Sequence, residues 1–127
     1  WKDGSISPGS LRGMLKDVSE RFLTPFRTGD NLRFAETKIR SLMGLLEDQV
    51  VENSRDLLLA TENLGLWYTA ATVLKGAIVR QESRGAHYRA DFPDEEKDWK
   101  RPIYIGKRSG SLAPGLGKMW PDRSLDS

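Results

Sequence analysis

The sequence contains no cysteine and only one histidine, and these two shortages exclude several kinds of chemistry. Without cysteine the chain has no disulfides, no thiolate nucleophiles and no ligands for iron–sulfur clusters, and most structural zinc sites lose their ligands as well. A single imidazole leaves little with which to hold another metal ion. We therefore do not expect a metalloenzyme.

Long hydrophobic runs are also missing. No apolar stretch approaches the ~20 residues that cross a bilayer, so no transmembrane segment is expected. The first residues, Trp1-Lys2-Asp3-Gly4, lack the apolar segment of a signal peptide, which predicts a cytoplasmic location. Because the chain begins with Trp rather than Met, we expect a piece of a longer polypeptide or a processed product.

The chain has no large excess of charge of one sign, since its 127 residues include 20 basic and 18 acidic side chains. A net charge of +2 does not by itself indicate binding to nucleic acid, and no nucleic-acid partner is expected. Basic residues do gather between Lys100 and Arg123, in a stretch rich in Gly, Pro and Ser. A free-standing interaction module that binds an acidic partner or nucleic acid through this tail stays open as an alternative.

Three segments carry apolar residues at the three- and four-residue spacing of amphipathic helices. The predicted helices span about 8–23, 30–48 and 54–84. Ser7 supplies an N-cap for the first helix, with Pro8 at its first position. Asp30 can cap the second helix, and Asn53 or Ser54 the third.

The third helix carries the longest apolar pattern, at the a and d positions of consecutive heptads. Its members are Leu57, Ala60, Leu64, Trp67, Ala71, Leu74, Ile78 and Gln81. This seam predicts packing against near-parallel neighbours, with Trp67 in the core. Gly85 stands where a helix commonly ends in a left-handed residue.

Three amphipathic helices with short connections predict an all-α fold, an antiparallel three-helix bundle similar to a spectrin repeat. The length suits one core, so we expect residues 1–127 to form a single domain. Residues 86–127 are predicted to be an irregular, basic tail. Residues 102–105 could form one short strand, whose partner we expect outside this chain.

One glycine-rich segment of the tail resembles a nucleotide-binding motif without meeting its requirements. Gly115-Leu116-Gly117-Lys118 looks like the end of a phosphate-binding loop. That loop needs glycine at the position of Leu112 and Ser or Thr at the position of Met119. We therefore assign the segment to a flexible tail rather than to a nucleotide site.

The predicted end of the third helix concentrates charge, a glycine and the only histidine. Arg80 and Arg84 lie four residues apart, where like charges repel on a helix, so an anionic group is expected to face them. Catalysis by His87 is disfavoured, because no carboxylate, Ser or Cys has recognisable spacing to it.

Three interpretations of this cluster remain, and the favoured one is an interface with another domain. The others are a site for a carboxylate or phosphate ligand and a set of purely internal salt bridges. Sequence alone suggests few local acceptors besides Glu82. The residues assigned to docking are Arg80, Glu82, Ser83, Arg84, Gly85, His87, Arg89 and Asp91.

The run from Arg80 to Arg89, followed by Asp91-Phe92-Pro93 and then Asp98-Trp99, resembles the C-terminal helical domain of succinate dehydrogenase and fumarate reductase flavoproteins. L-aspartate oxidase ends in a similar domain. Phe26-Arg27-Thr28-Gly29 resembles the family's turn between the first two helices. The likeness covers about residues 10–105.

The resemblance implies a non-catalytic domain of an FAD-dependent oxidoreductase of the succinate dehydrogenase or fumarate reductase type, an enzyme of electron transport. In that family FAD and the substrate-handling residues belong to other domains, so no cofactor and no catalytic residue is expected here. The docking residues would brace the bundle against the FAD domain. Two expectations stay open: peripheral attachment to the cytoplasmic membrane face and a partner iron–sulfur subunit. The L-aspartate oxidase domain is the alternative within the family.

Overall fold

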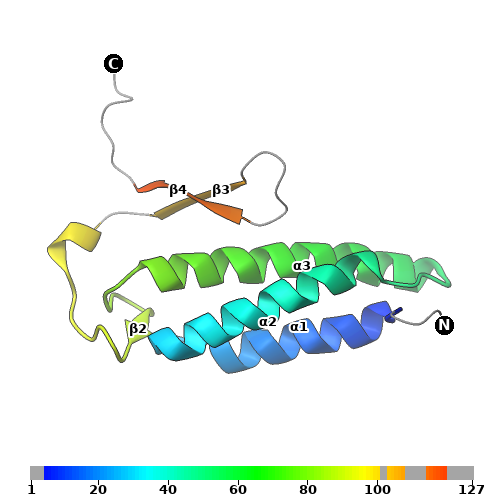
Figure 1. The fold of residues 1–127 in the computed structure, drawn as a ribbon, viewed down its shortest axis with the longest axis horizontal. Coiled ribbons are helices and arrows are strands. Elements are labelled where there is room, and N and C mark those ends of the chain that lie inside the picture. Colours follow the sequence, from blue (N-terminus) through cyan, green and yellow to red (C-terminus); the bar gives the residue numbers. More distant parts are fainter. Residues whose placement is uncertain (1–4, 101–102, 108–113, 120–127) are drawn as a thin grey trace, which may run out of the picture.

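A computed structural model describes residues 5–100, 103–107 and 114–119, and its main body is a bundle of three helices (Figure 1). The helices are α1 (Pro8–Phe22), α2 (Gly29–Glu47) and α3 (Ser54–Val79). Each helix contacts the other two, and the chain reverses direction at each connection. The predicted all-α, antiparallel three-helix bundle is confirmed.

The helices begin at polar caps, as short side chains that accept backbone N–H bonds require. Ser7 caps α1 and Asn53 caps α3, as predicted. The cap predicted for α2 is wrong, because Thr28 accepts from the backbone of Asn31. Asp30 instead lies in the first turn of α2, where its negative charge favours the positive end of the helix dipole.

The core lies along the bundle axis and is made of aliphatic side chains around one tryptophan. Trp67 is 2% exposed, as predicted, and its indole N–H donates to the backbone carbonyl of Ile39 at 2.7 Å. This bond satisfies the one polar atom that the ring takes into the core. The other buried members are Leu11, Leu15, Val18, Leu32, Ala35, Ile39, Leu42, Ala70, Ala71, Leu74 and Ala77.

The first part of the predicted α3 seam is wrong. Leu57 and Leu64 are 59% and 46% exposed, whereas Asn63, Ala70 and Ala77 are buried. A straight α-helix drifts by ~20° per heptad relative to a strict seven-residue repeat. Residues spaced by heptads along the 26-residue helix α3 therefore face the core near the middle of the helix but lie at the edge of its buried face near the start.

The predicted end of the third helix is also wrong, since α3 ends at Val79 rather than near residue 84. Arg80 takes an extended conformation with φ −74° and ψ 94°. Gly85 does have the left-handed φ of +58°, but in a loop beyond the helix. The helix ends early because a guanidinium from the following loop binds its last carbonyls.

The segment after α3 is more regular than predicted. Strand β1 (Phe26–Arg27) pairs in parallel with β2 (Tyr88–Arg89), and Lys97–Trp99 forms a 3₁₀ turn. Strand β3 (Ile103–Lys107) pairs antiparallel with β4 (Pro114–Met119), and both contact α3 (Figure 1).

The strand at residues 102–105 therefore finds its partner within this chain, contrary to prediction. The two glycines of β4 give that segment low strand propensity, which explains why the sequence did not reveal it. Residues 101–102, 108–113 and 120–127 of the predicted tail lie outside the described residues. Within the described part of the chain, no helix combines the length and apolar character that a bilayer span requires.

Candidate functional site

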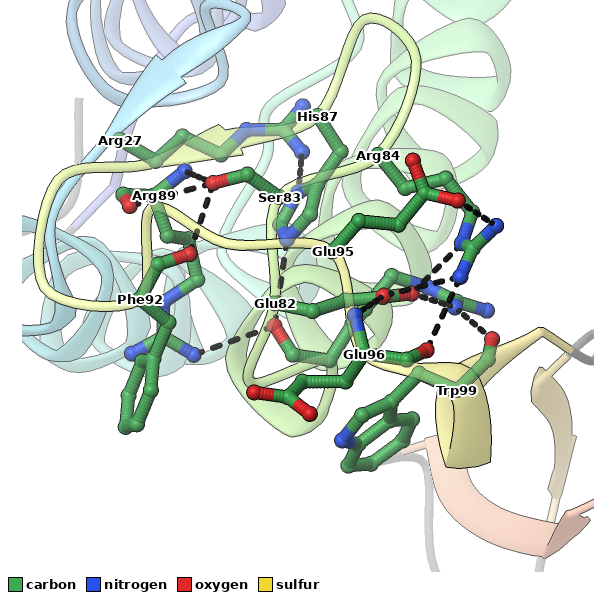
Figure 2. Close-up of polar contacts among 11 residues, drawn as sticks. Arg27, Glu82, Ser83, Arg84, His87, Arg89, Phe92, Glu95, Glu96 and Trp99 are labelled. Carbon is green, nitrogen blue, oxygen red and sulfur yellow. Dashed lines mark hydrogen bonds and ion pairs between the residues drawn. The ribbon is translucent and has the colours of Figure 1, made fainter.

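The eight residues assigned to docking lie together at the C-terminal end of α3 and in the loop that returns to the α1–α2 connection. Figure 2 labels five of them, Glu82, Ser83, Arg84, His87 and Arg89. The predicted shortage of local acceptors is wrong. Carboxylates of this loop and backbone carbonyls of α3 and the loop accept most of the donors. The internal ion pairs, which were one of the three interpretations, are therefore present.

Glu82 is the centre of this region and is 0% exposed. Its Oε1 accepts from Arg80 Nη1 at 2.7 Å and from Arg84 Nε at 2.9 Å, and its Oε2 accepts from the backbone N–H of Glu96 at 2.9 Å. Burial alone would raise the pKa of Glu82, but the bonds from Arg84, Glu96 and Arg80 outweigh it and lower the pKa to about 2. The carboxylate is thus the anionic group expected between the two arginines.

Arg84 and Arg80 also reach the segment 95–99. Arg84 donates to the Glu95 carboxylate at 2.6 Å and to the Glu96 carbonyl at 2.9 Å. Arg80 donates to the Trp99 carbonyl at 2.7 Å and lies over the Trp99 ring. We call Arg80, Glu82, Arg84 and Glu96 the Glu82 cluster. It fixes the course of the chain after α3 on the surface of the bundle.

Ser83 and Gly85 shape the loop itself. The Ser83 hydroxyl accepts from the Arg89 backbone N–H at 2.9 Å and donates to the Phe92 carbonyl at 2.8 Å. Arg84 and His87 exchange two backbone bonds of 2.8 and 3.0 Å around a two-residue turn. Gly85 is the first residue of that turn, and its φ of +58° favours glycine there.

Arg89 explains the early end of α3. Its side chain is 5% exposed, and Nη1 donates to the Ile78 carbonyl at 2.8 Å, with longer 3.4 Å contacts to the carbonyls of Ala77 and Arg80. The last carbonyls of a helix have no partner within it, and the dipole favours a cation there. One guanidinium therefore caps the C-terminus of α3 through the carbonyls of Ala77, Ile78 and Arg80.

Asp91 holds Arg89 from the other side, and we call the pair the helix-end bridge. Arg89 Nε and Nη2 donate to the two carboxylate oxygens of Asp91 at 3.1 and 2.7 Å. Bonding to Arg89 lowers the pKa of Asp91, and a smaller contribution comes from the backbone of Gly29, the first residue of α2. A Cβ at Gly29 would lie 2.5 Å from Asp91 Oδ2 and 2.9 Å from Arg89 Nη2, so a larger residue there would have to displace the helix-end bridge.

His87 joins the loop to the connection between α1 and α2. Its Nδ1 accepts from Arg27 Nη1 at 2.6 Å, which leaves Nε2 to donate to the Arg80 carbonyl at 3.2 Å. Burial lowers the pKa of His87, and the positive charges of Arg27, Arg80 and Arg89 lower it further. A neutral imidazole between cations is a structural contact rather than a catalytic base.

Arg27, Glu95 and Trp99 also belong to this site but were not among the residues predicted for it. Arg27 is 60 residues from His87, so spacing could not link them. The resemblance of the Phe26–Gly29 turn to the family was the one available signal. Among the described residues, no group of acidic, histidine or cysteine side chains is placed to hold a metal ion.

The chain is similar to known proteins over most of its length. The family described as the fumarate reductase flavoprotein C-terminus matches residues 12–110. One subunit of the CoM/CoB fumarate reductase of Methanothermobacter marburgensis is 35% identical over 111 residues, covering 84% of this chain and 20% of that protein. The fumarate reductase flavoprotein subunit of Helicobacter pylori is 31% identical over 108 residues, covering 80% of this chain and 15% of that protein.

Two further similarities extend the comparison. L-aspartate oxidase of Bacillus subtilis is 33% identical over 74 residues, which cover 58% of this chain and 14% of that protein. A chain in the structure of Mycobacterium smegmatis Sdh1 in complex with UQ1 has the same fold, with a TM-score of 0.79 at 20% identity, covering 89% of this chain and 20% of that chain. The chain thus spans about a fifth of the length of such relatives. It belongs to the family of fumarate reductase flavoprotein C-terminal domains.

Proposed function

We propose that this chain is the non-catalytic C-terminal domain of an FAD-dependent oxidoreductase of the succinate dehydrogenase or fumarate reductase type. The family match over residues 12–110 carries the proposal. The described polar groups of the Glu82 cluster and the helix-end bridge are bonded to one another, which leaves them poorly placed to bind a cofactor. We therefore assign FAD, the substrate and the hydride transfer to the rest of the parent protein.

The domain packs against the flavin domain through the loop that follows α3. Arg80, Glu82, Ser83, Arg84, Gly85, His87, Arg89 and Asp91 act in docking, mostly by holding this loop in one conformation. Gly85 and Ala86 are exposed at the tip of the loop, where small residues permit another backbone to approach closely. Backbone hydrogen bonds hold the loop beneath these two residues in one conformation. Few residues would therefore lose conformational freedom when the loop binds another domain.

The assembly of the parent protein follows from the same family. The proposal also includes an iron–sulfur subunit as a second partner, a role in electron transport, and a cytoplasmic location at the membrane face. The second candidate is the C-terminal domain of an L-aspartate oxidase, which the similarity to the Bacillus subtilis enzyme favours. The sequence of the full-length protein and its activity on L-aspartate separate the two.

The test compares the 127-residue chain with the full-length protein. The chain alone is expected to be colourless and to support no fumarate-dependent oxidation of a reduced dye. The full-length protein is expected to show the absorbance of bound flavin. A yellow, active preparation of the 127-residue chain, or a full-length protein without flavin, would contradict the proposal.

A further inference from the structure

Two large aromatic side chains lie exposed on the strands β1 and β2, beside the loop that follows α3. Phe26 is 67% exposed and Tyr88 is 39% exposed. Their rings stack with centroids 5.0 Å apart and an interplanar angle of 27°. Aromatic residues are enriched among the side chains that contribute most to protein interfaces. The pair therefore forms a preassembled apolar surface.

The backbone beneath this pair is held in place by the parallel pairing of β1 with β2. The Tyr88 N–H donates to the Pro25 carbonyl at 2.9 Å, and the Ala90 N–H donates to the Arg27 carbonyl at 2.8 Å. Phe26 and Tyr88 are direct partners in the register. Side chains that are already ordered lose little conformational entropy on binding, which favours their use as an anchor.

Arg27 follows Phe26 directly in β1 and carries a charge that the described residues do not neutralise. Its Nε donates to the Thr24 carbonyl at 2.7 Å, and its Nη1 donates to the neutral ring of His87 at 2.6 Å (Figure 2). No carboxylate of the described residues lies within ion-pair distance of it, whereas Arg84 and Arg89 both have one. Burial lowers the pKa of Arg27. A partly buried cation of this kind is stabilised by a carboxylate.

We infer that Phe26, Tyr88 and Arg27 form an anchor that binds a carboxylate-bearing apolar surface of the flavin domain in the same polypeptide. The stacked rings supply apolar contact, and an Asp or Glu side chain of the flavin domain pairs with the Arg27 guanidinium. The inference rests on the proposed function, since the partner is the part of the parent protein outside this chain. The flavin domain is the chosen occupant because the aligned part of this chain is only 20% of the first relative, so that most of such a protein lies outside this chain.

The anchor is tested in the full-length flavoprotein with Arg27→Lys and a carbodiimide, which joins an amine to a carboxylate in direct contact. The expected product links position 27 to an Asp or Glu outside residues 1–127, identified by mass spectrometry. Arg21→Lys is the matched control, because Arg21 pairs with Asp17 on α1 and its product is expected within the chain. Adding Phe26→Ala to Arg27→Lys is expected to reduce the interdomain product several-fold, whereas adding Phe34→Ala, at another exposed aromatic residue, leaves it unchanged.

The outcomes separate the anchor from the proposed function. Products confined to residues 1–127, or no product at position 27, overturn the anchor. So does an amide formed with added succinate in place of a protein carboxylate, because Arg27 would then bind a free dicarboxylate. If any of these results is obtained and the wild-type full-length protein still binds flavin, the anchor is wrong but the proposed function stands. A wild-type full-length protein that lacks flavin overturns the proposed function, whatever the cross-link shows.

Discussion

The Arg89 guanidinium makes two bonds to the Asp91 carboxylate, and this ion pair joins the C-terminus of α3 to the N-terminus of α2. Each partner has the charge that its helix dipole favours, positive at the end of α3 and negative at the start of α2. The pair is also local in sequence, since the two residues are separated only by Ala90. A short loop thereby fixes the relative position of two antiparallel helices.

Arg89→Ala is expected to reduce the free energy of unfolding by about 1–3 kcal/mol, the usual cost of leaving buried hydrogen-bond acceptors without a donor, since Asp91 is 36% exposed and stays partly solvated. The variant leaves Asp91 without its partner and the last carbonyls of α3 without a donor. Urea unfolding measures the loss. Arg21→Ala, which breaks an exposed pair with Asp17, is expected to cost no more than about 0.5 kcal/mol.

Arg89→Lys retains the charge without the planar fork of donors, and an intermediate loss is expected. This variant keeps the test decisive if Arg89→Ala does not fold. Equal losses for Arg89→Lys and Arg21→Ala would show that the helix-end bridge contributes no more than a surface pair.

Glu82 is expected to make the stability depend on pH in the acid range. Its pKa is about 2 in the folded protein, against an ordinary value of 4.5, so the unfolded state binds the proton more tightly. The stabilisation is complete above about pH 4.5 and is lost as the pH falls toward 2. Urea unfolding across this range should show a steeper decline for the wild type than for Glu82→Gln, and parallel profiles would contradict the ionised Glu82 cluster.

His87 is expected to titrate below its ordinary pKa of 6.5, because burial and the charges of Arg27, Arg80 and Arg89 disfavour the imidazolium. The unfolded state then binds the proton more tightly, so stability is full above about pH 6.5 and falls as the pH decreases through the folded-state pKa. NMR measures the pKa and the tautomer of His87 without resonance assignment, because the chain has one histidine. A pKa at or above 6.5, or a proton on Nδ1, would rule out the contact with Arg27.

Gly85→Ala is expected to reduce the free energy of unfolding by about 1–2 kcal/mol, the cost of a left-handed conformation for a residue with a Cβ. Gly65→Ala is a control of opposite sign. Gly65 lies in α3 with open space where a Cβ would stand, so alanine there should stabilise the helix by about 1 kcal/mol. Thermal unfolding compares the two, and a neutral Gly85→Ala would contradict the loop conformation.

The helices could be predicted from the sequence because their signals are local. Apolar spacing and capping side chains such as Ser7 and Asn53 act within a few residues, so they mark where helices begin. The end of α3 could not be predicted in this way. It depends on Arg89, a residue beyond the helix whose side chain reaches the Ile78 carbonyl because the loop folds back on the helix.

The sequence drew attention to eight residues of the candidate region, but it indicated neither Arg27, Glu95 and Trp99 nor the contacts that all of these residues make. The motif concentrates charge visibly, whereas the pairing of Arg27 with His87 and of Arg84 with Glu95 depends on the path of the loop. The same limit applies to β3 and β4, because Gly-rich β4 has little strand propensity of its own and is defined by its partner. Tertiary pairing, rather than local preference, decided each of these features.

If the loop after α3 braces this domain against a flavin domain, as we propose, then breaking the Glu82 cluster lowers the temperature at which FAD leaves the full-length protein. Arg84→Ala breaks the Glu82 cluster, whereas the control Arg12→Ala breaks a surface pair with Glu62 in the same domain. Flavin fluorescence during heating is expected to show release several degrees lower for Arg84→Ala than for the wild type and Arg12→Ala. Identical release temperatures for all three proteins would contradict the claim.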